Sequence, residues 1–75
     1  MKELIEFIAK SLVDNPSEVH VRVETRLDSV YLELSVADED MGRVIGRGGR
    51  VANAMRALLH VAASQRGVRS SLDIV

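Results

Sequence analysis

Hydrophobic and polar residues follow two different periods in the N-terminal half of the chain, and each period predicts a type of element. Apolar residues recur at helical spacing over residues 2–13, and Asp14-Asn15-Pro16 ends the pattern because the residue before a proline avoids the helical region. Residues 19–26 and 30–37 instead alternate between apolar and polar side chains, as strands with one buried face do. The three residues Leu27–Ser29 between them predict a short turn and therefore an antiparallel hairpin.

The C-terminal half predicts two helices and a last strand. The first is a short apolar helix that precedes the glycine-rich stretch Gly46–Gly49. The second is a long amphipathic helix from Gly49 to about Gln65, which Gly67 stops. Residues 68–75 predict a strand, which can run parallel to a neighbour because it follows a helical crossover. The residues expected to face the core from the long helix are Val51, Ala54, Met55, Leu58 and Ala62.

The predicted element order is helix–strand–strand–helix–helix–strand. Each strand has one apolar and one polar face, so all three helices are expected on a single face of a three-stranded mixed sheet. The predicted fold class is therefore α+β. Residues 1–75 are expected to form one domain, because no linker, repeat or low-complexity segment divides them.

Composition narrows the range of functions. The chain has no cysteine, which excludes disulfides and thiolate metal sites, and no apolar run approaches the roughly 20 residues that a membrane span needs. The start Met1-Lys2-Glu3 does not suit a signal peptide, and the lack of cysteine permits a reducing cytoplasm. An enzyme is the least expected class, because His20 and His60 lie on different predicted elements without paired carboxylates near them.

Charge is distributed unevenly along the chain, although the net charge is only −1. Residues 1–40 carry four Lys or Arg and ten Asp or Glu, whereas residues 41–75 carry six Arg and one Asp. No carboxylate lies between Met41 and Leu72. This distribution favours a local positive field that attracts polyanions to one side of the molecule; ordinary solvated faces are the alternative interpretation.

The glycine loop, Gly46–Gly49, is the main candidate for a binding site. Its glycines leave no side-chain bulk at either end, so a foreign backbone can approach the main-chain N–H groups closely. The long helix begins at the same loop and directs its positive dipole end there. Arg47 offers a forked donor in the middle of the loop, and Arg43 and Arg50 flank it. We interpret the loop as a site for a sugar–phosphate backbone.

Residues 44–51, with the sequence Val-Ile-Gly-Arg-Gly-Gly-Arg-Val, resemble the K-homology (KH) signature of an apolar pair, a GXXG loop and an amphipathic helix. The element order resembles the type II, bacterial arrangement. The similarity is closer still to the small stand-alone KH proteins of bacteria, the KhpA (YlqC) type. It extends over residues 12–16, 36–42, 52–59 and 72–75, and so covers essentially the whole chain.

This resemblance implies single-stranded RNA binding in the cytoplasm without a cofactor, a metal or a membrane. It also implies a dimer, either of the chain with itself or with a larger partner of the KhpB (Jag/EloR) type. RNA chaperoning and, in some bacteria, control of cell length and cell wall are further implications. One departure is Gly48, where loops of the family commonly carry a bulkier polar residue; Arg47 stands where lysine is frequent.

We expect the N–H groups of Gly48 and Gly49, together with Arg47, to hold the phosphates of about four nucleotides. The bases would turn into a groove whose floor is partly Val44 and Ile45, with the strand over residues 30–37 as the other wall. Ordinary core is the alternative for Ile45, and solvated surface is the alternative for the outer arginines. The predicted RNA-binding residues are Arg43, Val44, Ile45, Gly46, Arg47, Gly48, Gly49, Arg50, Asn53 and Arg56.

Two further interpretations concern other parts of the chain. The alternative function is a protein–protein adaptor, with the helix around Val61 as its working surface and the KH fold serving mainly for dimerisation. Residues Asp38-Glu39-Asp40 are expected to cap the short helix, with Asp40 accepting a first-turn N–H; a magnesium site is the other interpretation of these acids.

Overall fold

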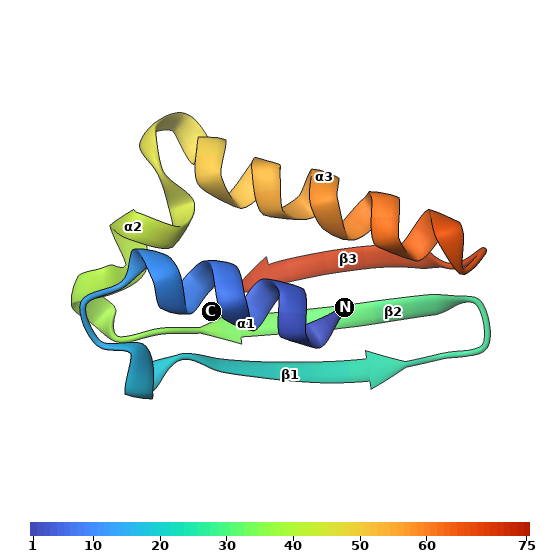
Figure 1. Cartoon of the computed structure of the whole chain (residues 1–75), viewed down its shortest axis with the longest axis horizontal. Coiled ribbons are helices and arrows are strands. Elements are labelled where there is room, and N and C mark those ends of the chain that lie inside the picture. Colours follow the sequence, from blue (N-terminus) through green and yellow to red (C-terminus); the bar gives the residue numbers. More distant parts are fainter.

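In the computed structural model, which describes all 75 residues, three helices lie over one face of a three-stranded sheet (Figure 1). The predicted element order and the α+β fold class are confirmed. Short 3-10 turns occupy Pro16–Glu18, Asp38–Asp40 and Arg47–Gly49. The helices are α1 (Lys2–Leu12), α2 (Met41–Ile45) and α3 (Arg50–Gln65), and the strands are β1 (His20–Thr25), β2 (Ser29–Ser35) and β3 (Arg69–Ile74).

The strand order is β1-β2-β3, which places β2 in the middle of the sheet. Strand β1 pairs with β2 antiparallel, with Val23 opposite Leu32, and β3 pairs with β2 parallel, with Leu72 opposite Leu32. The predicted hairpin and the predicted parallel last strand are therefore confirmed. Because β2 is central, Val30, Leu32 and Leu34 on its inner face are all buried, whereas β1 and β3 each leave one backbone edge open.

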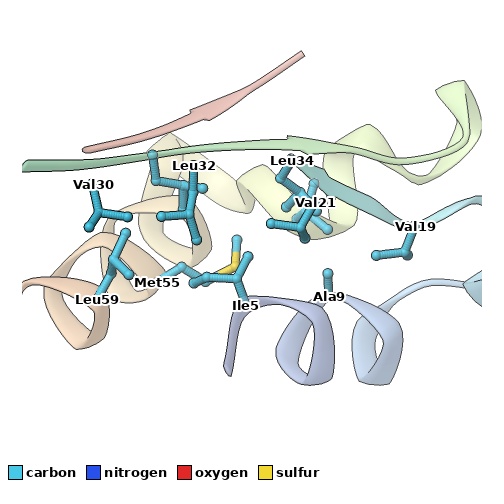
Figure 2. Packing of buried hydrophobic residues seen from close by; sticks show 11 residues of the cluster. Ile5, Ala9, Val19, Val21, Val30, Leu32, Leu34, Met55 and Leu59 are labelled. Carbon is cyan, nitrogen blue, oxygen red and sulfur yellow. The ribbon is translucent and has the colours of Figure 1, made fainter. Parts of the chain in front are cut away.

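The core lies between the helices and the inner face of the sheet. Figure 2 shows Ile5 and Ala9 of α1 and Met55 and Leu59 of α3 pointing towards the side chains of β1 and β2. Burial of each large aliphatic side chain contributes about 1.5–3 kcal/mol, and this layer is the main source of stability in so small a chain. The cluster consists of Ile5, Ala9, Val19, Val21, Val30, Leu32, Leu34, Val44, Met55, Leu59 and Leu72.

The face of α3 that meets the core differs from the predicted one. Ala54 is exposed and Leu58 is 50% exposed, so placing these two residues in the core was wrong. The apolar residues of this helix span more of its circumference than the sheet can cover, and periodicity alone does not choose between the adjacent residues Leu58 and Leu59. The residues that α3 buries are Ala52, Met55, Leu59 and Ala63.

Helix α1 also buries only part of its apolar surface. Ile5 and Ala9 are fully buried, Leu12 is 39% exposed, and Phe7 is 72% exposed. The outward position of Phe7 leaves a large apolar ring on the surface of the helical layer. None of the three helices combines the length and the apolar content that crossing a lipid bilayer requires.

Candidate nucleic-acid interface

The glycine loop joins α2 to α3 through a tight bend that projects away from the sheet (Figure 1, yellow). Gly46, Gly48 and Gly49 all have positive φ angles, of 76°, 63° and 80°. A Cβ atom on Gly46 would lie 2.6 Å from Cγ2 of Val51 and 2.8 Å from its backbone nitrogen, which no side chain tolerates. The glycines are therefore required by the backbone path, and the path leaves Arg47 and Gly48 exposed.

Hydrogen bonds within the loop determine which N–H groups an anion could use. The N–H of Gly46 donates to the carbonyl of Gly42 at 2.9 Å, and the N–H of Gly49 donates to that of Gly46 at 3.1 Å. The N–H of Arg50 donates to the carbonyl of Arg47. Gly49 was expected to hold a phosphate through its N–H, but this group is engaged within the loop. The loop-closing bonds leave the N–H groups of Arg47 and Gly48 free for an anion.

The predicted arginines fall into two groups. Arg47 and Arg50 are exposed and take part in no ion pair. Arg43 instead pairs with Asp14, and Arg56 donates from Nε to the carbonyl of Leu72 at 3.0 Å. Asn53 accepts a bond of 3.2 Å from Nη1 of Arg56, which fixes the plane of that guanidinium. Arg47 and Arg50 are therefore immediately available for phosphate, whereas Arg43 and Arg56 are held by the protein.

The apolar pair before the loop divides between the core and the surface. Val44 is fully buried and belongs to the core cluster, so in this conformation it offers no surface to a base. Ile45 is 37% exposed and does offer one. Val44 anchors a helix of only five residues, which is too short to be stable by itself, and so holds Ile45 and the loop in place.

An open groove of about 440 Å³ runs between α3 and β3. The expected wall, residues 30–37, was wrong, because β2 lies in the middle of the sheet and β3 is the strand beside α3. The direct connection of the long helix to the last strand through Gly67 is the sequence signal that could have indicated this wall. The groove is lined by Arg56, Leu59, His60, Ser70, Ser71, Leu72 and Asp73, of which only Arg56 was among the predicted site residues.

The open edge of β3 gives the groove main-chain donors and acceptors. The N–H groups of Arg69 and Val75 donate to carbonyls of Asp28 and Leu34, which fixes the odd-numbered residues of β3 as the ones facing β2. In a parallel pair the alternate residues face away, so the N–H and C=O groups of Ser70 and Leu72 point outward. Arg56 uses the Leu72 carbonyl, and the remaining groups are of the kind that recognise base edges.

Asp40 does not cap α2 as predicted; it ties two distant segments together. Its side chain is fully buried and accepts bonds from the N–H groups of Asp14 at 3.2 Å and Asn15 at 3.1 Å, and from Nδ2 of Asn15 at 3.0 Å. Burial raises the pKa of Asp40, but the Asn15 side chain, these backbone donors and the charge of Arg43 outweigh it, so the pKa lies below its usual value. The acids at 38–40 form no metal-binding cluster.

Comparisons with known proteins give a consistent result. A family model described as "KhpA/KhpB, KH domain" matches residues 2–74. The chain is 51% identical to the RNA-binding protein KhpA of Clostridium acetobutylicum and 48% identical to that of Clostridium perfringens, over the full length of both chains in each case. It is 43% identical to the RNA-binding protein KhpA of Chlamydia trachomatis, covering all of this chain and 96% of that protein.

A solved structure has a similar fold. It is the crystal structure of Era in complex with MgGDPNP and nucleotides 1506–1542 of 16S ribosomal RNA, with a TM-score of 0.65 and 16% sequence identity. The match covers 97% of this chain and 28% of that one. At this level of identity the similarity concerns the fold alone.

The lowered pKa of Asp40 predicts a pH-dependent contribution to stability. A carboxyl group with a lowered folded-state pKa stabilises the fold above its unfolded-state pKa of about 4, and this contribution is lost as the pH falls through the folded-state value. Asp40→Asn should lower the free energy of unfolding at pH 7 and flatten its decrease below about pH 4. Urea unfolding from pH 7 to pH 2 measures both, with Asp28→Asn on the exposed hairpin as a charge-matched control. Parallel pH profiles for the wild type and Asp40→Asn would contradict the assignment.

The two glycines Gly46 and Gly48 should differ sharply in their tolerance of a methyl group. Gly46→Ala forces the start of α3 to move. It should lower the free energy of unfolding by at least about 3 kcal/mol, since backbone strain and overpacking add. Gly48→Ala meets no atom within 4 Å and should cost only the positive-φ penalty of about 1–2 kcal/mol. Urea denaturation compares the two variants; equal losses would show that the contact between Gly46 and Val51 does not control the bend.

Proposed function

Since this chain belongs to the KhpA/KhpB family of KH domains, we propose that it is a single-stranded RNA-binding protein. The observation that carries the proposal is the exposed glycine loop, which sets two free N–H groups and two unpaired arginines at the start of α3. Relatives of nearly equal length bear the name RNA-binding protein KhpA. The proposal is for a binding protein and not for an enzyme.

Phosphate recognition would take place at the loop. The free N–H groups of Arg47 and Gly48 donate to a phosphate oxygen, the α3 dipole favours its negative charge, and the guanidinium of Arg47 supplies charge-assisted bonds. Arg50 follows one turn later on the exposed side of α3. The absence of carboxylates from Met41 to Leu72 keeps repulsion low along the path of the strand.

Base recognition would take place in the groove between α3 and β3. Leu59 and Leu72 line it but are only 1% and 2% exposed, so they offer little apolar surface to a base. The outward main-chain groups of Ser70 and Leu72 present both donors and acceptors at its edge. His60 supplies the one aromatic ring in the groove, because Phe7 lies on α1 and Tyr31 hydrogen-bonds to Glu33 and Asp73 on the outer face of the sheet. This distribution favours hydrogen bonding to base edges over extensive stacking.

Dimerisation is the second part of the proposal. Ala54, Ala57, Leu58 and Val61 are exposed and are spaced by three and four residues, so they form one outward apolar stripe on α3. Leu58 and Val61 are 50% and 56% exposed. The stripe lies on a different flank of α3 from Arg56 and His60, so a partner and an RNA strand could bind together. A site for about four nucleotides binds weakly, and pairing two sites raises avidity through effective concentration.

The partner would be a second copy of this chain or a larger KH protein of the KhpB (Jag/EloR) type. The same apolar stripe also supports the alternative function, a protein–protein adaptor in which RNA binding plays no part. Cytoplasmic location, RNA chaperoning and control of cell length or cell wall rest on the family resemblance. The two functions differ in whether the glycine loop matters, and the experiments below separate them.

The double variant Arg47→Asp/Gly48→Asp tests the phosphate site. It removes a positive charge and adds two negative ones at the bend, so affinity for a single-stranded RNA oligonucleotide should fall by at least about tenfold. Aspartate is among the residues that tolerate positive φ best, and position 48 has open space around it, so the fold should persist by circular dichroism. Fluorescence anisotropy measures the affinity over a range of salt concentrations.

A matched control exists at the other end of α3. Arg66-Gly67 repeats the same dipeptide, and Gly67 also has a positive φ and open space, so Arg66→Asp/Gly67→Asp makes the same chemical change away from the loop. It should reduce affinity much less than the loop variant. Equal effects of the two variants, or an affinity for RNA that does not change with salt, would rule out a phosphate site at the loop.

The double variant Leu58→Asp/Val61→Asp tests the apolar stripe. It places two charges on the outward flank of α3 without entering the core, so it should yield a folded monomer where the wild type is a dimer. RNA affinity should also fall, because avidity is lost. Analytical ultracentrifugation gives the mass, and Leu27→Asp, which removes a fully exposed leucine from the hairpin, is the control. An unchanged mass would exclude the stripe as the dimer surface.

A further inference from the structure

Two carboxylates of the protein itself hold Arg43, on the last turn of α2 before the glycine loop. Nη2 of Arg43 lies 3.0 Å from Oδ2 of Asp14, in the segment that follows α1, and Nε lies 3.7 Å from Oδ1 of Asp40. The two partners have very different surroundings. The Asp14 side chain is 70% exposed, whereas that of Asp40 is 1% exposed.

The buried carboxylate of Asp40 does not need Arg43 to satisfy its hydrogen bonds. Its two oxygens already accept three bonds from Asp14 and Asn15, all between 3.0 and 3.2 Å, so the buried charge stays satisfied if the arginine leaves. The closer pair, between Arg43 and Asp14, joins two side chains that are 53% and 70% exposed. Ion pairs of this exposure contribute little to stability because water screens them. Arg43 can therefore be released at small cost.

We propose that Asp14 is a built-in competitor of RNA for Arg43. The inference rests on the function proposed above and concerns how the affinity of that site is set. In the free protein the Asp14 carboxylate occupies the guanidinium; in the complex a phosphate of the bound strand replaces it, and Asp14 returns to water. A guanidinium binds a phosphate as readily as a carboxylate, so one anion exchanges for another.

Asp14 lowers affinity in two ways by this mechanism. RNA must break the pair between Arg43 and Asp14 before it gains the contact, and the released carboxylate then repels the strand. The free carboxylate also takes up a counterion, which partly cancels the counterions that the RNA releases. An Asp14→Asn variant should therefore bind RNA more tightly than the wild type and with a steeper dependence on salt.

The substitution Asp14→Asn leaves the structural role of this position intact. Residue 14 holds Asp40 through its backbone N–H and not through its side chain, so the tie between the two segments remains. Affinity should rise up to about fivefold, as expected when an exposed ion pair is removed, and the slope of log affinity against log salt should steepen by up to about 0.7. Fluorescence anisotropy with the same RNA oligonucleotide measures both.

Two comparisons make the test specific. Asp28→Asn on the hairpin changes the net charge equally and should raise affinity much less. In an Arg43→Gln background the gain in affinity from Asp14→Asn should largely disappear, because the Asp14 carboxylate then has no guanidinium to pair with. A gain no larger than that of Asp28→Asn, or a full gain without Arg43, would overturn the proposal. If Arg47→Asp/Gly48→Asp still weakens binding in that case, only this inference fails; if it does not, the RNA-binding function fails too.

Discussion

The absence of a Cβ atom at Gly46 is the constraint on which the rest of the site depends. Val51 lies so close to this residue that any side chain would overlap its backbone nitrogen, and the approach allows α2 and α3 to meet within four residues. The bend fixes the direction in which α3 leaves the loop. Helix α3 then leads directly into β3, the strand that borders the groove.

The buried carboxylate of Asp40 helps to hold α2, the helix that leads into this bend. A helix as short as α2 gains little from its own hydrogen bonds, so its position depends on Val44 in the core and on Asp40, which accepts three bonds from Asp14 and Asn15. The apolar packing of Val44 and the hydrogen bonds of Asp40 thus hold α2, and with it the start of the loop, in place. A rigid support suits a site that recognises an anion with main-chain donors, because their geometry must be set before the anion arrives.

Local sequence features predicted the elements and the loop, and they failed where distant segments meet. Alternation and helical spacing reveal the type of an element, and glycine spacing reveals the bend. Periodicity cannot choose between Leu58 and Leu59 when the apolar arc is wider than the face that is buried. The partners of Asp40 lie 25 and 26 residues away, so a capping role was the natural local interpretation and was wrong. The lining of the groove depends on strand order, which the pattern of single elements leaves open.

The long helix α3 serves several roles because a helix presents different residues in different directions. Its N-terminus meets the loop, one face enters the core, one flank borders the groove, and another carries the apolar stripe. A chain of 75 residues has few surfaces, and the proposed base-binding groove and the proposed dimer surface lie on separate flanks of this one helix. If two copies of the chain pair through α3, their two sites would act as linked sites, and the second would bind the same RNA strand at a high effective concentration. The weakness of a four-nucleotide site is then compatible with a useful affinity for longer RNA.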